Sequence, residues 1–172
     1  MLTSRIVSSH GWALAALLAS ISGGCASSEQ PRVCTDIGCA DGLQVAFSPN
    51  SGWQPGQYRF VIDVDGQVTT CEGSLPLRSC DAGPSLQCTP AGDRIGVGES
   101  GCALPPEQHG FSDLRVGGSP AQSVTVTVSR DGAELVKKTL APEYKTSQPN
   151  GPGCEPVCHN ASEALAIPGA AP

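Results

Sequence analysis

Nine cysteines are the feature that most constrains how this chain of 172 residues can fold. In an oxidising compartment, paired cysteines form disulfide bonds that stabilise a fold by roughly 2 to 4 kcal/mol each. Such crosslinks matter because only 4% of the residues are aromatic, so the core must consist mainly of Val, Leu, Ile and Ala. The length fits one domain, and we expect disulfides to supply much of its stability.

Glycine and proline are too frequent for long helices. The chain has 21 glycines and 15 prolines, and each one in a helix interior costs about 1 to 3 kcal/mol. Short strands joined by many turns accommodate these residues better. The composition therefore predicts an all-β domain.

The N-terminus has the organisation of an export signal. Arg5 is the only charged residue before Glu29, and an apolar run from Trp12 to Ile21 follows it. This run is too short to cross a hydrocarbon core of about 30 Å and is typical of a cleaved signal peptide. Export would bring the cysteines into oxidising conditions.

The signal ends at Ser22-Gly23-Gly24-Cys25, which resembles the lipobox of bacterial lipoproteins, where small residues precede a cysteine that is acylated and becomes the new N-terminus. Ser22 stands where that family usually has leucine. The resemblance implies that residues 1–24 are a signal peptide, that Cys25 is the lipidation site and that acyl chains anchor the protein. Ala26 implies, by the same resemblance, the outer membrane. Ordinary secretion, with cleavage after Gly24 or Ala26, stays open as the alternative.

If Cys25 carries lipid, the remaining cysteines are even in number and all of them can pair. They are Cys34, Cys39, Cys71, Cys80, Cys88, Cys102, Cys154 and Cys158. Cys34 and Cys39 precede the predicted β region, whereas Cys154 and Cys158 follow it. We therefore expect the first pair to join the second and to fasten the two ends of the domain.

The charge of the mature chain argues against nucleic acid as a partner. Loss of residues 1–24 removes Arg5 and leaves nine basic residues against 16 acidic ones, a formal charge of −7. An acidic surface repels phosphate backbones. It also gives no attraction to anionic lipids, so membrane attachment would depend on the acyl chains.

Strict alternation of apolar and polar residues predicts three strands. Their apolar positions are Leu43, Val45 and Phe47 in the first, Tyr58, Phe60, Ile62 and Val64 in the second, and Val124, Val126 and Val128 in the third. Asp65-Gly66 follows the second strand and Asp131-Gly132 follows the third, and both dipeptides are typical of tight hairpins. We expect return strands over residues 67–75 and 134–140.

The first hairpin makes a specific prediction about Cys71. If its turn has two residues, Cys71 lies opposite Phe60 on the buried face, and a core disulfide follows. The same register turns Gln67 inward and Val68 outward. A bulge that shifts the pairing by one residue therefore stays open.

Two stretches resist assignment to regular strands. Residues 76–120 combine three cysteines with many prolines and glycines, and we expect short strands and crosslinked loops there. Residues 149–158 are too rich in proline and glycine for regular structure. We place the domain at residues 34–166, after a polar tether at 25–33 and before a disordered tail at 167–172.

The two hairpins resemble paired strands of immunoglobulin-like and fibronectin-like domains, over about a third of the chain. The resemblance implies an antiparallel β-sandwich stapled by disulfides. It concerns architecture only, because the residues match no characterised functional family.

Two motifs between residues 96 and 101 match known sites only in part. Gly96, Gly98 and Gly101 have the spacing of a dinucleotide-binding loop, but prolines rather than a helix follow, so we expect a glycine-rich loop. Ser100 lies in a segment that faintly resembles the nucleophile loop of chymotrypsin-like proteases. That family places its histidine well upstream, where the mature chain has none.

Two further motifs point to cofactors but are incomplete. Cys154, Cys158 and His159 nearly form a haem-attachment motif, with one residue too many between the cysteines, so structural disulfides are the better interpretation. Asp63 and Asp65 are a fragment of a calcium loop without its remaining ligands. We therefore predict no metal and no cofactor.

Trp53 is the one side chain that we single out as facing a ligand, although a half-buried plug at one end of the sandwich is the more favoured interpretation. The sequence contains no motif that combines an acid, a base and a nucleophile. We therefore expect a non-enzymatic, structural or adhesive module whose partner is a protein or a glycan. The alternative is a small extracytoplasmic hydrolase or carbohydrate-binding domain, with a site built from separate loops around carboxylates or His109.

Overall fold

The computed structural model describes residues 33–169, in which a compact unit begins at Cys34. Strands account for 52% of these residues, and none of them forms an α-helix. The strands are β1 (Gly42–Pro49), β2 (Gly56–Val64), β3 (Gln67–Leu75), β4 (Gln87–Thr89), β5 (Ile95–Ser100), β6 (Gly110–Gly117), β7 (Val124–Arg130), β8 (Ala133–Leu140), β9 (Lys145–Ser147) and β10 (Cys158–Ile167). Two short 3-10 turns are η1 (Cys80–Ala82) and η2 (Pro106–Gln108). The all-β prediction is confirmed.

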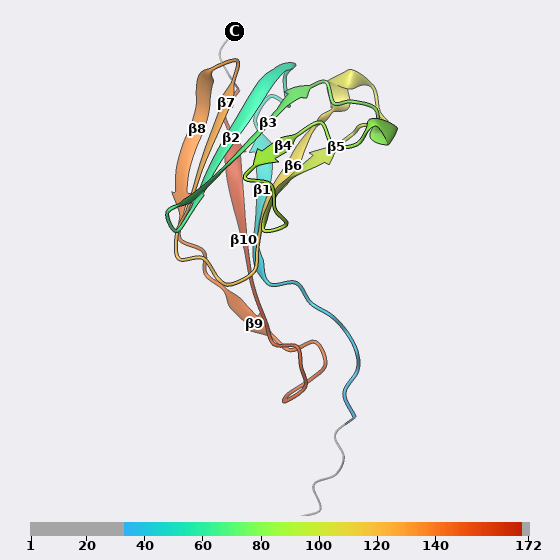
Figure 1. Ribbon diagram of the computed structural model, residues 1–172, viewed down its shortest axis with the longest axis vertical. Helices are drawn as coiled ribbons and strands as arrows, with labels where there is room; N and C mark the ends of the chain where they lie inside the picture. Colours follow the sequence, from blue (N-terminus) through green and yellow to red (C-terminus); the bar gives the residue numbers. More distant parts are fainter. Residues whose placement is uncertain (1–32, 170–172) are drawn as a thin grey trace, which may run out of the picture. The chain divides into compact units, whose positions relative to one another are not determined.

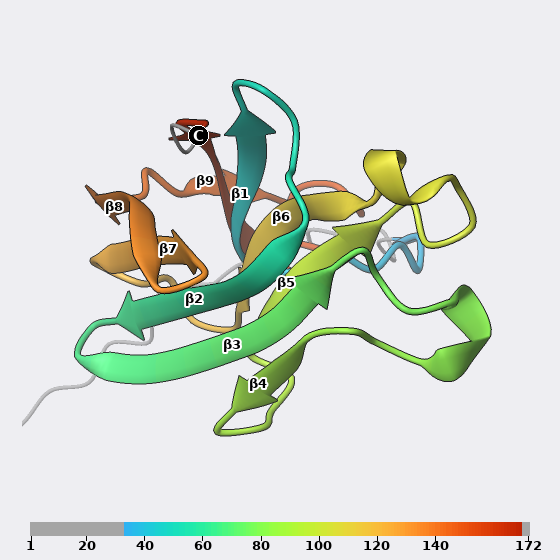
Figure 2. The ribbon, with the colours of Figure 1, turned by 90° about the horizontal axis from the view of Figure 1, so that it is seen from above.

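The strands form two five-stranded sheets that pack face to face in a sandwich-like arrangement (Figures 1 and 2). Sheet A has the order β5-β6-β1-β10-β9, and sheet B has the order β4-β3-β2-β7-β8. The prediction of a purely antiparallel sandwich is wrong in one place, because β1 pairs with β10 in parallel. Parallel pairing arises since these strands lie at opposite ends of the domain's sequence and no hairpin connects them.

Sheet B follows the sequence pattern closely. Residues Tyr58, Phe60, Ile62 and Val64 of β2 and Val124, Val126 and Val128 of β7 are all buried. Asp65 (φ 51°) with Gly66 (φ 87°), and Asp131 (φ 52°) with Gly132 (φ 83°), form the two tight turns. Consecutive positive φ angles match the right-handed twist of the strands, which explains why both turns use Asp-Gly.

The predicted register of the first hairpin is confirmed. Phe60 lies opposite Cys71, which is fully buried, and no residue is inserted between β2 and β3. The alternative with a bulge is therefore wrong. Gln67 at the first position of β3 is exposed, so its polar side chain does not enter the core. Cys71 bonds to Cys88 of the neighbouring strand β4.

Sheet A contains strands that the sequence did not predict. In β6, Phe111, Leu114 and Val116 are buried, although residues 76–120 were expected to hold only short strands. Strand β10 follows the irregular segment and runs to Ile167, which is 2% exposed and accepts a hydrogen bond from the backbone of Asn50 at 3.0 Å. Ile167 thus belongs to the core and not to a disordered tail.

The disulfides of the described residues fall into two groups. Cys34–Cys154 and Cys39–Cys158 join segments 120 and 119 residues apart, which is the end-to-end pairing expected from the sequence. Cys71–Cys88 and Cys80–Cys102 close short loops of 17 and 22 residues. These bonds indicate an oxidising, extracytoplasmic location.

The predictions about the N-terminus concern residues outside this structure. The signal peptide at 1–24, the lipidation site Cys25 and the tether up to residue 32 all lie outside the described residues. Within residues 33–169, no helix has the length and apolar character that spanning a membrane requires.

Candidate functional site

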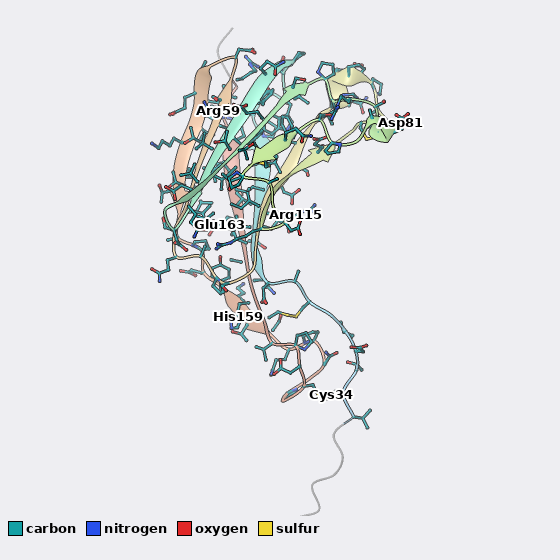
Figure 3. All side chains as sticks on the ribbon, viewed as in Figure 1. Cys34, Arg59, Asp81, Arg115, His159 and Glu163 are labelled. Carbon is teal, nitrogen blue, oxygen red and sulfur yellow. A yellow bond between two sulfur atoms is a disulfide. The ribbon has the colours of Figure 1, made fainter. Side chains whose placement is uncertain are left out.

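A hollow of about 650 Å³ opens on the outer face of sheet A, over β1, β6 and β10. Its polar lining consists of Asp41, Gln44, Asp93, Arg94, Arg115, Asn160 and Ser162. Gln44, Arg115 and Ser162 point outward because their neighbours in the same strands face the core. Figure 3 labels Arg115, which belongs to β6.

Two opposed glycines create much of this hollow. Gly42 of β1 pairs with Gly117 of β6, and both line the hollow, so two adjacent positions of the sheet surface carry no side chain. Gly42 has a φ of 130°, and a Cβ there would overlap the carbonyl oxygen of Val116. Glycine at position 42 is therefore required by the backbone itself.

A β-bulge lies on β6 beside the hollow. Val97 pairs with Leu114 and Glu99 with Phe111, so Gly98 of β5 faces both Ser112 and Asp113. The extra residue places two successive polar side chains outside the core, while Phe111 and Leu114 on either side remain buried. A Cβ on Gly98 would collide with the Asp113 carboxylate and the Ser112 hydroxyl.

Asp113 is only 4% exposed, and three side chains donate hydrogen bonds to its carboxylate. Oδ1 accepts from Ser112 Oγ at 2.6 Å, whereas Oδ2 accepts from Arg115 Nε at 2.8 Å and from Gln44 Nε2 at 3.1 Å. Burial by itself would raise the pKa of this carboxyl, but the bonds from Ser112, Arg115 and Gln44, with the charge of Arg115, hold it below its ordinary value. Asp113 is therefore a carboxylate at neutral pH.

One edge of the Arg115 guanidinium is hydrogen-bonded, whereas its other edge faces solvent. Its Nε donates to Asp113, and this contact raises the pKa of the guanidinium further. The side chain is 71% exposed. No acceptor in residues 33–169 takes a hydrogen bond from its two Nη groups, so these donors are available to a ligand.

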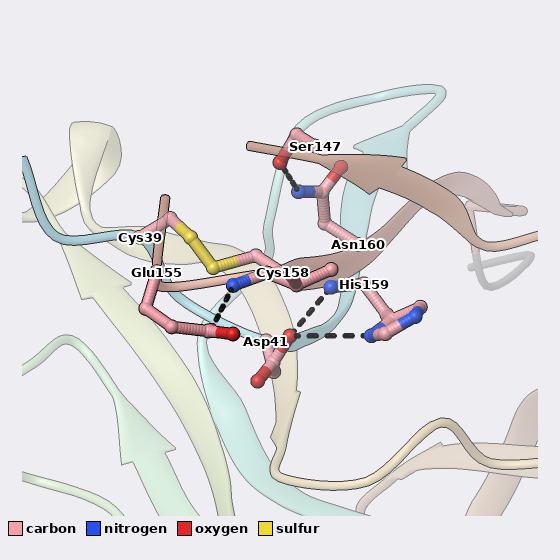
Figure 4. A network of polar contacts seen from close by, with 8 residues as sticks. Cys39, Asp41, Ser147, Glu155, Cys158, His159 and Asn160 are labelled. Atoms are coloured by element: carbon pink, nitrogen blue, oxygen red, sulfur yellow. Dashed lines mark hydrogen bonds and ion pairs between the residues drawn. A yellow bond between two sulfur atoms is a disulfide. The ribbon is translucent and has the colours of Figure 1, made fainter. Parts of the chain in front are cut away.

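Asp41 and Asn160, which line the hollow, lie close to the disulfide Cys39–Cys158 (Figure 4). Cys39 lies two residues before Asp41, and its partner Cys158 directly precedes His159. Asp41 Oδ1 accepts from the backbone N–H of His159 at 2.5 Å and lies 4.0 Å from its Nδ1. Asn160 Nδ2 donates to Ser147 Oγ at 3.4 Å. The crosslink thus fixes the positions of Asp41 and Asn160.

No family model, curated protein or solved structure matches this chain. The chemistry of the hollow must therefore be judged from its own residues.

Both ring nitrogens of His109, a candidate residue for the alternative hydrolytic site, form hydrogen bonds with the backbone. His109 is 8% exposed. Its Nδ1 accepts from the Leu77 N–H at 2.9 Å, and its Nε2 lies 2.8 Å from the carbonyl of Leu104, to which it donates. Neither ring nitrogen is free to take a proton from a nucleophile.

The glycine-rich motif is an edge strand and not the loop that the sequence led us to expect. Gly96, Gly98 and Ser100 all lie in β5, and η2 after it has three residues, too few to form a phosphate-binding helix. The Glu99 carboxylate accepts the Leu86 N–H at 2.7 Å. Neither a dinucleotide loop nor a protease nucleophile is assembled there.

The two carboxylates of the calcium-like fragment stabilise turns. Asp63 Oδ1 accepts from the Gly66 N–H at 2.8 Å, within the hairpin. Asp65 Oδ1 accepts from the Gln122 and Ser123 N–H groups at 3.1 and 2.8 Å. In the described residues, no group of three or more potential metal ligands comes together.

Trp53 packs into the end of the core. Its ring makes edge contacts with Phe47, Tyr58 and Phe111, with centroids 5.0 to 5.9 Å apart. Its Nε1 donates to the Phe111 carbonyl at 2.9 Å. The ring and its polar atom are both engaged, so the structure gives Trp53 the role of a plug rather than a ligand contact.

Cys154 and Cys158 are both in disulfides, so their sulfurs cannot form thioether bonds to haem in this state.

The sequence patterns did not single out Asp113 and Arg115. The signal for them was the order apolar, polar, polar, apolar, polar, apolar over residues 111–116. Two adjacent polar residues inside an alternating pattern are what a bulge leaves in a sequence.

Proposed function

We propose that this chain is a non-enzymatic binding module of the cell envelope, held at the outer membrane by acyl chains on Cys25. Its domain is an immunoglobulin-like sandwich, a proposal supported by two packed sheets and two tight hairpins. The partner is a protein or glycan component of the envelope that enters the hollow on sheet A.

The observation that carries this proposal is the open hollow with its polar lining. Its residues offer hydrogen bonds and charges for recognition. The one buried histidine of the described chain, His109, lies in a different part of the fold and has both nitrogens engaged. Such a lining favours binding over proton transfer.

Cysteine pairing supports the lipid anchor. The four bonds use every cysteine of the mature chain except Cys25. An acylated Cys25 leaves no unpaired thiol, whereas secretion without lipidation leaves one or removes it. The acidic charge of the chain offers no other attraction to a membrane.

Capture from the native envelope tests the proposed function. The full-length protein, extracted in an uncharged detergent and immobilised, is expected to retain an envelope component that a variant with a narrowed hollow, Gly117→Val, does not retain. The retained component is expected to elute chemically unchanged. Retention by both proteins alike, or conversion of the component into a product, would contradict the proposal.

A small hydrolase remains the second candidate because two carboxylates, Asp41 and Asp93, share the hollow. A glycosidase uses a pair of carboxylates on either side of the scissile bond. The single variants Asp41→Asn and Asp93→Asn separate the candidates. A glycan-cleaving activity of the wild type that either change abolishes would establish the hydrolase.

A further inference from the structure

The guanidinium of Arg115 is arranged in advance of any ligand. Its Nε is fixed 2.8 Å from Asp113 Oδ2, which orients the planar group, and its Nη donors face outward in a side chain that is 71% exposed. A planar fork with two outward N–H groups matches the two oxygens of a carboxylate. Fixing the fork beforehand lowers the entropy lost on binding.

The support beneath Arg115 is elaborate for a solvent-facing residue. It needs a bulge at Ser112 and Asp113, a glycine at position 98 that leaves space for both side chains, and a buried carboxylate with three donors. An ion pair with a buried carboxylate often adds little net stability, because the cost of removing the charge from water offsets the attraction. Because stability alone gives little reason for this arrangement, we attribute it to the orientation of Arg115.

The rest of the lining restricts what a ligand can be. Arg94 also lines the hollow, but its Nη1 donates to Gln67 Oε1 at 3.4 Å outside it, whereas Asp41 and Asp93 repel a second anionic group. Gln44, Asn160 and Ser162 offer neutral hydrogen bonds. The lining contains no aromatic ring on which a base could stack. These features fit a small molecule with one carboxylate and either an ammonium group or hydroxyl groups.

We propose that the hollow binds the carboxylate group of a small polar ligand through the outward donors of Arg115. This inference rests on the proposed binding function and names the chemistry that the site recognises. Such a carboxylate belongs either to the free end of a peptide or to an acidic sugar.

Calorimetric titration of the full-length protein in uncharged detergent tests the proposal with two matched pairs of probes. Glycylglycine is compared with glycylglycinamide, and D-galacturonate with D-galactose. In at least one pair the form with a carboxylate is expected to bind about tenfold to a hundredfold more tightly than the form without it, the effect of one charged hydrogen-bonded contact. The pair that responds identifies the source of the carboxylate.

Single variants separate binding from folding. Arg115→Gln is expected to lose the preference for carboxylate, and Arg115→Lys to weaken it because one ammonium cannot both contact Asp113 and present a fork. Gly117→Val narrows the hollow, and its Cβ would lie in ordinary contact with the nearest atom, Arg94 O, at 3.6 Å. Ala133→Val, at an exposed position of β8 in sheet B and away from the hollow, is the control that keeps binding. Melting curves of each variant show whether it folds.

Two results would overturn the proposal. One is equal binding of the probes with and without a carboxylate, or binding of none of the four. The other is a carboxylate preference that Arg115→Gln and Arg115→Lys both retain while folded. In either case the envelope capture with Gly117→Val still decides independently whether the hollow is a binding surface.

Discussion

Sheets A and B are held together in different ways. In sheet B, β2 with β3 and β7 with β8 are neighbours in sequence, each joined by a two-residue Asp-Gly turn. In sheet A, β1 pairs with β10 across more than a hundred residues, and two disulfides fasten the segments that lead into these strands. Local turn chemistry forms the two hairpins of sheet B, where Cys71–Cys88 also joins β3 to β4, whereas the terminal disulfides fasten the long-range strand pair of sheet A.

This difference follows from loop entropy. Closing a two-residue turn restricts little of the chain, whereas pairing strands at opposite ends of the domain requires a long loop to close before any contact forms. A crosslink lowers this entropy cost of folding, because it already restricts the unfolded chain. Cys39–Cys158 also lies close to Asp41 and Asn160, so the terminal disulfides support both the pairing of β1 with β10 and the hollow that we propose as a binding site.

The largest expected effect is the loss of both terminal disulfides. Replacement of Cys34, Cys39, Cys154 and Cys158 by Ser is expected to lower the free energy of unfolding by about 7 kcal/mol, since one long loop and a second short one are both released. Either bond removed alone costs only about 2 to 3 kcal/mol, because the other still closes the long loop. Urea denaturation measures these changes. In the single-bond variants, hydrogen exchange is expected to rise in β1 and β10 before β2 and β3, and the reverse order would contradict the comparison.

The next largest effect concerns the bulge in sheet A. Gly98→Ala places a methyl group against Asp113 and Ser112 and is expected to destabilise the domain by about 1 to 3 kcal/mol. The matched control is Gly96→Ala in the same strand, whose Cβ meets open space and which is expected to change stability by less than about 1 kcal/mol. Thermal unfolding compares the two. Equal stabilities would show that the carboxylate cluster does not depend on the glycine.

A smaller effect is expected from the turn of sheet B. Gly66 has a φ of 87°, so Gly66→Ala is expected to cost about 1 to 2 kcal/mol through backbone strain. Because the change lies in the turn between β2 and β3 of sheet B, it is expected to leave the disulfides and the β1–β10 pairing intact. Urea denaturation with and without reductant checks this. If Gly66→Ala lowered the free energy of unfolding more than the loss of both terminal disulfides does, the comparison of the two sheets would be contradicted.

The smallest effect is a dependence on pH that resides in sheet A. The pKa of Asp113 is lower in the fold than the unfolded value of about 3.9. Its charge therefore adds stability above about pH 4, and this contribution is lost as the pH falls through the lower folded pKa. Asp113→Asn is expected to flatten the stability profile below about pH 4. The control Asp81→Asn removes a fully exposed carboxyl and is expected to change the profile less; similar profiles for the two variants would count against the buried cluster.

The sequence was sufficient for the parts of the fold that depend on local chemistry. Alternation and Asp-Gly turns predicted β2, β3, β7 and β8 of sheet B, and Cys71 opposite Phe60 was one of two registers that the sequence left open. The cysteine positions predicted that Cys34 and Cys39 join Cys154 and Cys158, but not which cysteine joins which. Strands β6 and β10 were not predicted, because the bulge interrupts alternation in one and small residues dilute it in the other.

The candidate site could not be predicted because its residues come from distant strands. Gln44, Asp113 and Arg115 meet only when β1 pairs with β6, and Gly98 matters only because it faces the bulge. Each of these residues looks like an ordinary surface position in sequence. Conversely, His109 and Trp53 stood out by residue type, yet their polar atoms are engaged within the fold.

The most direct test of the account is a non-reduced peptide map, by mass spectrometry, of the protein extracted from its native membrane. The account predicts acyl chains on Cys25 and the linkages Cys34–Cys154, Cys39–Cys158, Cys71–Cys88 and Cys80–Cys102, with no free thiol. Free thiols at Cys34, Cys39, Cys154 and Cys158 in folded material would contradict it, because sheet A would then stand without its crosslinks.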